Sequence, residues 1–109
     1  MTPDEARVKL EEYRVLIDDV DRRIVELLNE RTQVVEEIGR VKRESELPIY
    51  EPKREEQVFA NITGSNGGPM SSDALRRIFE RIIDEMRKIQ RVRMESGGKN
   101  ERMESGGKK

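Results

Sequence analysis

The fold is decided by residues 10–41, which read LEEYRVLIDDVDRRIVELLNERTQVVEEIGRV. Ten positions in this stretch follow one another at alternating spacings of three and four residues. They are Leu10, Tyr13, Ile17, Val20, Ile24, Leu27, Arg31, Val34, Ile38 and Val41. Nine of the ten are apolar or aromatic, which is the heptad pattern of a long helix with one continuous apolar seam.

The predicted helix is too long for a compact monomer. From Thr2 to about Ser45 the chain has no proline after Pro3 and no glycine except Gly39, so no strong helix breaker interrupts it. At about 1.5 Å per residue, such a helix is roughly 60 Å long. A compact chain of about 100 residues has a radius of gyration of only about 13 Å. The remaining residues cannot cover this helix, and we therefore expect a homodimer.

Two further helices are predicted after the seam. Pro48 and Pro52 end the pattern, and a proline in the first turn indicates a short helix from Pro52 to about residue 63. Residues 64–69 read GSNGGP, a loop. The third helix has three N-cap candidates, Ser71, Ser72 and Asp73. The expected inward positions are Glu55, Phe59 and Ile62 on the second helix, and Leu75, Phe79, Ile82, Met86 and Ile89 on the third. With no alternating run bounded by turn residues, we predict an all-α fold of three helices within residues 1–92.

A repeated segment follows residue 92. The heptapeptide RMESGGK occupies residues 93–99 and recurs at residues 102–108. Two such copies are too short for a solenoid repeat and too polar for a core. We interpret residues 93–109 as a flexible tail, a linker or an expression scar.

The composition excludes several classes of chemistry. The chain has 109 residues with no histidine and no cysteine, which excludes Ser-His-Asp and Cys-His nucleophilic systems, thiol redox chemistry and an ordinary zinc site. The 22 Lys and Arg residues nearly balance 23 Asp and Glu, a net charge of −1, which provides no general reason to bind nucleic acid or an anionic membrane. Because the sequence shows no signal peptide and no apolar run near 18 residues, we expect a cytoplasmic protein.

Four polar residues fall on predicted inward faces. Arg31 occupies a seam position, and Lys42 lies 11 residues further on, within about 20° of the same helix face and about 16 Å along it. Glu55 aligns with the inward positions of the second helix, and Gln90 continues the 4,3,4 track of the third. A buried ion pair or a register-setting polar residue would explain Arg31 equally well, and each of the others could lie at a solvated edge. Together, they indicate a pocket for a small anion.

Arg14 adds a geometric constraint. It precedes Arg31 by 17 residues, which places it about 26 Å away and about 100° around the helix. Arg14 therefore cannot reach a site held by Arg31 and Lys42 of the same straight helix. It is either an ordinary surface arginine or a contribution from a second chain.

The sequence resembles the all-helical chorismate mutases of the AroQ class over roughly residues 5–92. The elements that carry the resemblance are Arg14, Asp21-x-x-Ile24-x-x-Leu27-Leu28-x-x-Arg31, Ile38-Gly39-x-x-Lys42, Pro48-Ile49-Tyr50-Glu51-Pro52-x-Arg54-Glu55, and Ile78-Phe79 with Gln90. The region from Pro48 to Pro69 is also similar in style to mutase domains fused to a 3-deoxy-heptulosonate-7-phosphate synthase. This second similarity implies a fused or associated synthase domain as a partner.

The resemblance implies an intertwined helical homodimer that converts chorismate to prephenate by a Claisen rearrangement in aromatic amino-acid biosynthesis. It implies that Arg31 and Arg14 of the second chain hold the two substrate carboxylates. It also implies that Lys42 and Gln90 donate to the ether oxygen of the breaking C–O bond. No metal or cofactor is expected, because a unimolecular pericyclic step needs no nucleophile and no proton shuttle.

The remaining site residues follow from the same resemblance. Glu55 is implied as the acceptor for the substrate hydroxyl, helped by the backbone near Glu51, and Arg54 as a support at the edge of the site. Two positions depart from a common family pattern. Glu51 stands where aspartate is frequent, and Met86 stands where many members have a small or polar residue near one carboxylate.

Three other functions are alternatives to the mutase. An isochorismate-pyruvate lyase resembles the same fold and uses a similar cationic pocket, although Gln90 opposite Lys42 favours the mutase. In a non-enzymatic dimerisation or regulatory module, Arg31, Lys42 and Glu55 would merely form a buried ion-pair network. A plain coiled-coil adaptor is disfavoured by the broad apolar face and the interrupted second segment.

Overall fold

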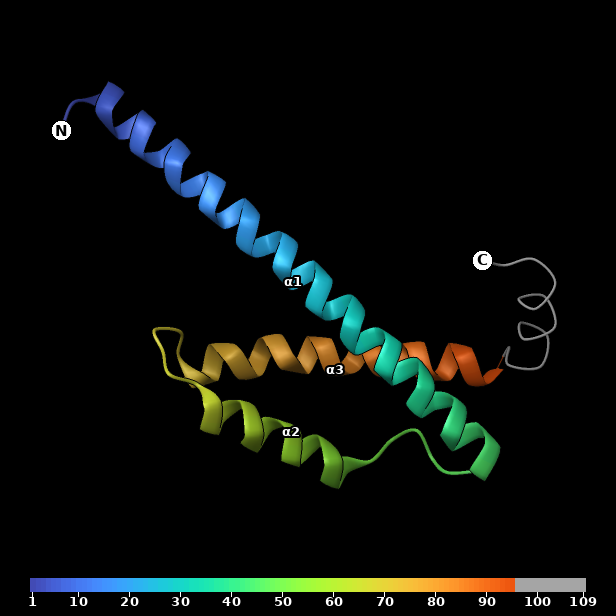
Figure 1. Ribbon diagram of the computed structural model, residues 1–109. Helices are drawn as coiled ribbons and strands as arrows, with labels where there is room; N and C mark the ends of the chain where they lie inside the picture. The colour runs from blue at the N-terminus through green and yellow to red at the C-terminus, as the bar shows by residue number, and fades with distance from the viewer. Residues whose placement is uncertain (96–109) are drawn as a thin grey trace, which may run out of the picture. The chain divides into compact units, whose positions relative to one another are not determined.

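The computed structural model describes the backbone of residues 1–95 and the side chains of residues 1–92, and that range holds three helices (Figure 1). α1 spans Pro3–Ser45, α2 spans Pro52–Ser65 and α3 spans Ser72–Glu95. No strand occurs among the described residues, and the all-α prediction is confirmed. α2 ends at Ser65, where an end at about residue 63 was expected, and α3 ends at Glu95, where an end at about residue 92 was expected. The rest of the predicted tail, residues 96–109, lies outside the described residues.

The chain divides into two compact units, Met1–Gln33 and Val34–Lys109, so that α1 belongs partly to each. The first unit is the N-terminal part of α1, and it begins with a capping box. The backbone amide of Glu5 donates to Thr2 Oγ1 at 3.1 Å, and the backbone amide of Thr2 donates to Glu5 Oε1 at 2.8 Å. Two amide groups at the start of the helix thereby find partners, which fixes where α1 begins.

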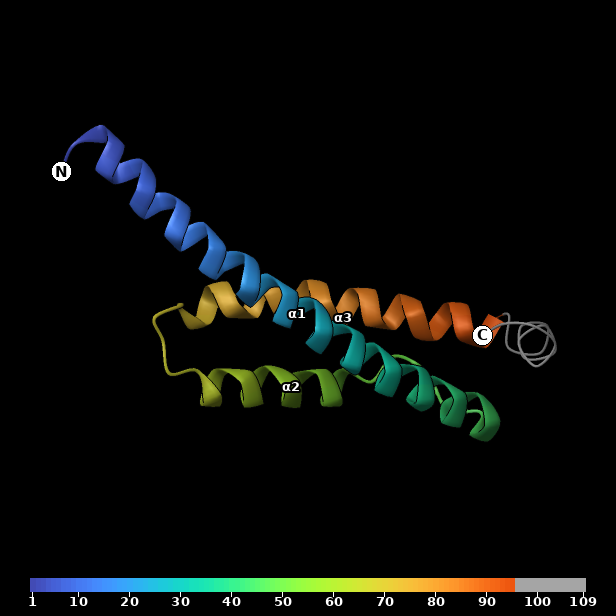
Figure 2. The ribbon, with the colours of Figure 1, turned by 45° about the horizontal axis from the view of Figure 1, so that its top comes forward.

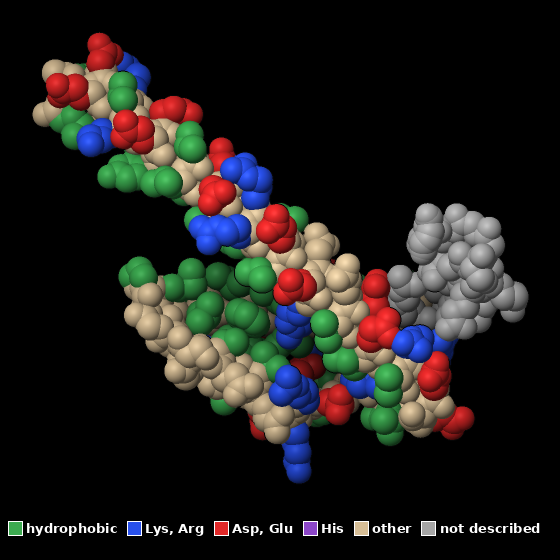
Figure 3. All heavy atoms as spheres, in the orientation of Figure 1, with side chains coloured by type: hydrophobic (Ala, Val, Ile, Leu, Met, Phe, Trp, Pro, Cys, Tyr) green, Lys and Arg blue, Asp and Glu red, His purple; other side chains and the backbone are tan. Residues whose placement is uncertain are grey.

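The apolar seam is uncovered within the first unit. Its side chains from Leu10 to Leu27 are exposed by between 42% at Val20 and 62% at Leu27, and Figure 3 shows hydrophobic side chains on the surface along this part of α1. The charged residues between them form ion pairs along the helix, such as Asp19 with Arg23 at 3.4 Å. Contiguous exposed apolar surface of this kind is typical of an interaction face.

α1 ends in a Schellman turn at Glu46. The amide of Leu47 donates to Lys42 O at 2.8 Å and that of Glu46 donates to Arg43 O at 3.3 Å. This pair of bonds requires a left-handed residue after the last helical turn, a position where glycine is usual. Glu46 adopts it with a φ of 56°. The turn reverses the chain and sends residues 47–51 back alongside Lys42.

In the second unit, α2 and α3 run antiparallel and side by side (Figures 1 and 2). The guanidinium of Arg76 on α3 lies 4.1 Å from the centre of the Phe59 ring on α2, a cation–π contact that joins the two helices. Ser71, one of the predicted N-caps, accepts a hydrogen bond from the amide of Ala74 at 3.1 Å. This cap fixes the start of α3.

The core of the second unit is small. Among the described residues, the buried hydrophobic side chains are Val35 on α1 and Ile83 and Met86 on α3. α1 and α3 meet where Gly39 packs against Gln90, and a Cβ added at Gly39 would lie 3.5 Å from Gln90 Cγ. That separation is an ordinary van der Waals contact, so the two helices approach closely here without a steric requirement for glycine.

None of the helices in the described part of the chain is both long and apolar enough to cross a bilayer.

Glu46 provides a test of the Schellman turn. Replacing it with glycine removes the left-handed strain of an L-residue, and we expect Glu46→Gly to raise the free energy of unfolding by about 1 kcal/mol. Glu44→Gly, two residues earlier in the last helical turn, is the matched control and should lower it by about 1 kcal/mol. Urea denaturation at one fixed protein concentration measures both. A destabilised Glu46→Gly protein would contradict the assigned turn.

Candidate active site

Lys42 is a buried cation in the last turns of α1. Lys42 is only 8% exposed. Its ammonium donates to the carbonyl oxygen of Ile49 at 3.0 Å and lies 2.8 Å from Glu51 Oε1. Burying a charge is costly unless it is paired and hydrogen-bonded. Both partners come from the segment that the turn at Glu46 brings back along the helix. The reversal of the chain at Glu46 therefore supplies the acceptor and the counter-charge that the buried Lys42 ammonium needs.

Glu51 responds to the same contact. The hydrogen bond from Lys42, and then the charge of that ammonium, hold the pKa of the Glu51 carboxyl below its ordinary value of 4.5. Desolvation opposes the shift, and the charge of Arg54 adds to it. From the sequence, a helping role was expected for the backbone near Glu51. The side chain reaches Lys42 because the two residues, nine positions apart, face each other across the turn.

Gln90 is a buried amide on α3. It is 9% exposed, and its Oε1 has no hydrogen-bond partner among the described residues. It packs on Gly39, which precedes Lys42 by about one turn of the helix. Buried polar atoms are normally hydrogen-bonded. Gln90, with this unpartnered acceptor atom, is therefore a candidate ligand contact.

Glu55 forms a bidentate ion pair with Arg87, a residue that was not among those expected from the sequence. Arg87 on α3 donates from Nε to Glu55 Oε2 at 3.1 Å and from Nη2 to Glu55 Oε1 at 3.2 Å. The guanidinium also lies 5.1 Å from the centre of the Tyr50 ring. Ile83, Arg87 and Gln90 follow a 4,3 spacing, so the inward track of the third helix already contained the signal. Arg87 was overlooked because an arginine on a charged helix is usually a surface residue.

The chain is similar in sequence and in structure to known chorismate mutases. Residues 13–91 match the sequence model described as chorismate mutase type II. The chain is 39% identical over 79 residues to the bifunctional chorismate mutase/prephenate dehydratase of Aquifex aeolicus (strain VF5), covering 69% of this chain and 22% of that protein. It is similar in structure to the chorismate mutase (Form II) of Thermus thermophilus, with a TM-score of 0.75 and 37% identity over 76% of this chain and 94% of that one.

The chain belongs to the type II chorismate mutase family. The resemblance identified in the sequence is thereby confirmed. A chorismate mutase of Methanocaldococcus jannaschii is also 33% identical over 54 residues, half of this chain and 54% of that protein. The chain spans 22% of the length of the Aquifex relative, whose name includes a second activity.

Two of the remaining residues that were expected in the mutase site, Met86 and Arg54, lie in different environments of the second unit. Met86 is buried beside Ile83 in the core. Arg54 is exposed in the first turn of α2, where Nη1 donates to Gln57 Oε1 at 3.3 Å. All the expected site residues from Lys42 onward therefore lie in the second unit. Arg14 and Arg31 lie in the first, where Arg14 is exposed and 3.8 Å from Glu11, and Arg31 is half-buried. The mutase roles of these two arginines stay predictions.

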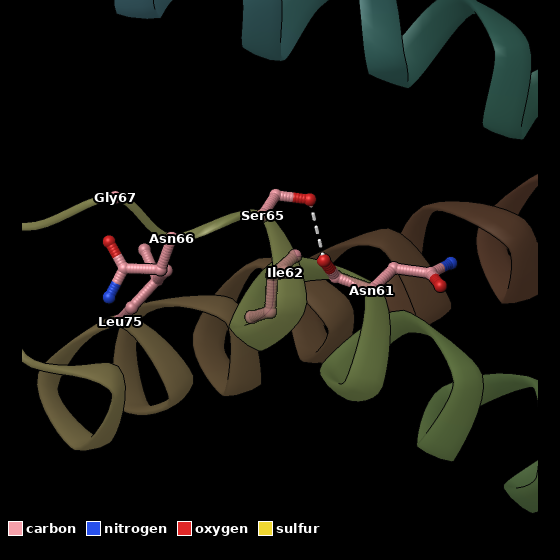
Figure 4. Close-up of a pocket in the computed structure, with 6 residues that line it drawn as sticks. All are labelled: Asn61, Ile62, Ser65, Asn66, Gly67 and Leu75. Atoms are coloured by element: carbon pink, nitrogen blue, oxygen red, sulfur yellow. Dashed lines mark hydrogen bonds between the residues drawn. The ribbon is translucent and has the colours of Figure 1, made fainter.

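A separate open pocket lies at the C-terminal end of α2, away from Lys42 and Glu55. It has a volume of about 350 Å³ and is lined by Asn61, Ile62, Ser65, Asn66, Gly67 and Leu75 (Figure 4). Ser65 Oγ there donates to Asn61 O at 2.7 Å. The lining has no charged side chain and none of the expected mutase residues. It does not have the chemistry that a dianion requires.

The Lys42–Glu51 pair should make stability depend on pH. Because the pKa of Glu51 is lowered in the folded state, its contribution is present above the ordinary value of 4.5 and is lost as pH falls through the folded-state value. We expect Glu51→Gln to lack this part of the acid destabilisation seen in the wild type. Urea denaturation between about pH 3 and 7 measures it. Glu26→Gln, on the exposed surface of α1, is the control, and an unchanged pH profile for Glu51→Gln would contradict the pairing.

Proposed function

We propose that this chain catalyses the Claisen rearrangement of chorismate to prephenate as a homodimer. The observation that carries the proposal is the buried ammonium of Lys42. Lys42 follows Gly39 by about one helical turn, and the buried amide of Gln90 packs on Gly39. Membership of the type II chorismate mutase family supports it. In this reaction one substrate breaks a C–O bond while a C–C bond forms, and the electrons move in a closed cycle.

Lys42 is prepared for the charge that develops during the step. An ammonium has three donors, and Ile49 O and Glu51 Oε1 are its acceptors among the described residues. Holding two donors aims the third, which we assign to the ether oxygen of the substrate. Negative charge grows on that oxygen as the bond breaks. A fixed cation therefore stabilises the transition state more than the ground state.

The other residues hold the substrate in its reactive shape. We assign Gln90 as a second donor to the ether oxygen and Glu55 as the acceptor for the ring hydroxyl, with Arg54, Met86 and Glu51 around them. The two carboxylates of chorismate call for bidentate cations. We assign these contacts to Arg31 and to Arg14 of the second copy.

The uncovered seam supports the homodimer. Apolar side chains from Leu10 to Leu27 are exposed in the first unit, and the buried hydrophobic core of the described residues is small. A second copy would cover this surface by the pairing that a heptad pattern favours. A place in aromatic amino-acid biosynthesis is consistent with the cytoplasmic location expected from the sequence. That location and the expected synthase partner stay predictions.

Removal of the Lys42 ammonium tests the assignment. We expect Lys42→Ala to lower turnover of chorismate by about 10²–10³-fold, or about 3–4 kcal/mol, because one donor to the developing charge is lost. Lys53→Ala, which removes an exposed lysine in the first turn of α2, should retain wild-type turnover. The measurement is the loss of chorismate together with identification of the product as prephenate. Near-wild-type turnover in Lys42→Ala, or release of pyruvate by the wild type, would refute the proposal.

A mixing experiment tests whether Arg14 comes from the second copy. Arg14→Ala and Lys42→Ala homodimers should each be nearly inactive. In a heterodimer of the two, one site has both residues intact and the other has neither. Refolding an equal mixture should therefore restore about a quarter of the wild-type activity.

The same mixture separates the alternatives. If both residues served a site within one chain, mixing would restore no activity. Sedimentation equilibrium of each variant shows whether it is still a dimer. A monomeric wild-type protein would refute the homodimer.

A further inference from the structure

The guanidinium of Arg87 contacts three segments of the chain: α2, its own helix α3 and the connection between α1 and α2. Two nitrogens form the fork on Glu55 of α2, and Nη1 lies 3.5 Å from Asp84 Oδ1 on its own helix. The Tyr50 ring, from the connection between α1 and α2, lies 5.1 Å away. The side chains of Arg87 and Glu55 are only 27% and 23% exposed. A fork with this much shelter holds its geometry better than a surface pair does.

The fork determines what Glu55 can do. A guanidinium has only donors, so both carboxylate oxygens that face it act as acceptors. A carboxylate has about four lone-pair positions, and the two that point away from Arg87 are left for a ligand. Glu55 is thereby held in one rotamer as an acceptor. A freely rotating carboxylate would lose side-chain entropy on binding a ligand.

The contact with Tyr50 connects this fork to Lys42. Tyr50 lies between Ile49, whose carbonyl accepts from Lys42, and Glu51, whose carboxylate pairs with Lys42. Three consecutive residues therefore contact a cation from α1 or a cation from α3.

We propose that Arg87 is a positioning residue that holds the Glu55 carboxylate ready to accept a hydrogen bond from the ring hydroxyl of the substrate. This inference rests on the proposed chorismate mutase function. Arg87 acts through Glu55 and does not touch the reacting atoms. A purely structural role, joining α2 to α3, is the competing explanation, and Arg76 stacked on Phe59 has that role elsewhere in the same pair of helices.

The test is a double-mutant cycle on chorismate turnover. Arg87→Met removes the fork while it retains most of the side-chain volume, and we expect it to raise KM about tenfold with a smaller change in kcat. The loss falls on KM because a hydroxyl–acceptor contact is made in the ground state and in the transition state alike. Arg87→Lys, which retains the charge without the fork, should recover part of the loss. Arg76→Met is the matched control and should leave both constants unchanged.

The cycle with Glu55→Gln separates positioning from packing. If Arg87 acts through Glu55, Arg87→Met should cost almost nothing further in the Glu55→Gln background. Fully additive effects, wild-type kinetics in Arg87→Met, or a lower kcat with unchanged KM would each overturn the inference. The last result would indicate a smaller folded fraction, which thermal unfolding would show.

Two further outcomes are distinguishable. If Arg87→Met fails to fold, Arg87→Lys and its combination with Glu55→Gln form the same cycle and are judged by the same criteria. A wild-type protein that leaves chorismate unchanged refutes the proposed function and this inference with it. An active wild type with an indifferent Arg87 refutes the inference alone.

Discussion

The buried ammonium of Lys42 is the constraint on which the arrangement of the second unit depends. An unpaired charge at that place would be far too costly, and its acceptors come from residues 49 and 51. The chain can supply them only by reversing immediately after α1, which explains why Glu46 adopts a left-handed conformation that suits glycine better. The start of α2, and with it the position of Glu55, follows from that reversal.

Charged residues serve two different purposes in this chain. Among the described residues, many ion pairs join residues three or four positions apart on one helix and are largely exposed, as in Arg81 with Glu85. Such pairs contribute little to stability. Lys42–Glu51 and Arg87–Glu55 instead join different segments and are partly sheltered. The near balance of the whole composition therefore carries no information about the site. The charges of the proposed site differ from the other pairs in the distance along the chain between the partners.

Sequence periodicity predicted the features that depend on one helix at a time. The seam, the prolines before α2 and the Ser71 cap led to three helices with nearly correct limits, because these signals are local. The inward positions of Lys42 and Gln90 followed from the same periodicity, and both are buried. The partners were beyond reach. Neither the fork of Arg87 nor the contact of Glu51 with Lys42 can be deduced without knowing how two segments face each other.

The exposed seam has a consequence for the life of the protein in a cell. When much of the apolar surface of a chain is covered only by a second copy, folding becomes a bimolecular reaction and its midpoint depends on concentration. For the proposed homodimer, newly made chains at low abundance would therefore remain monomers with an exposed seam, and the pool of dimeric protein would rise more steeply than the rate of synthesis. Gene dosage would thereby set flux through the active site in a non-linear way, without any effector molecule.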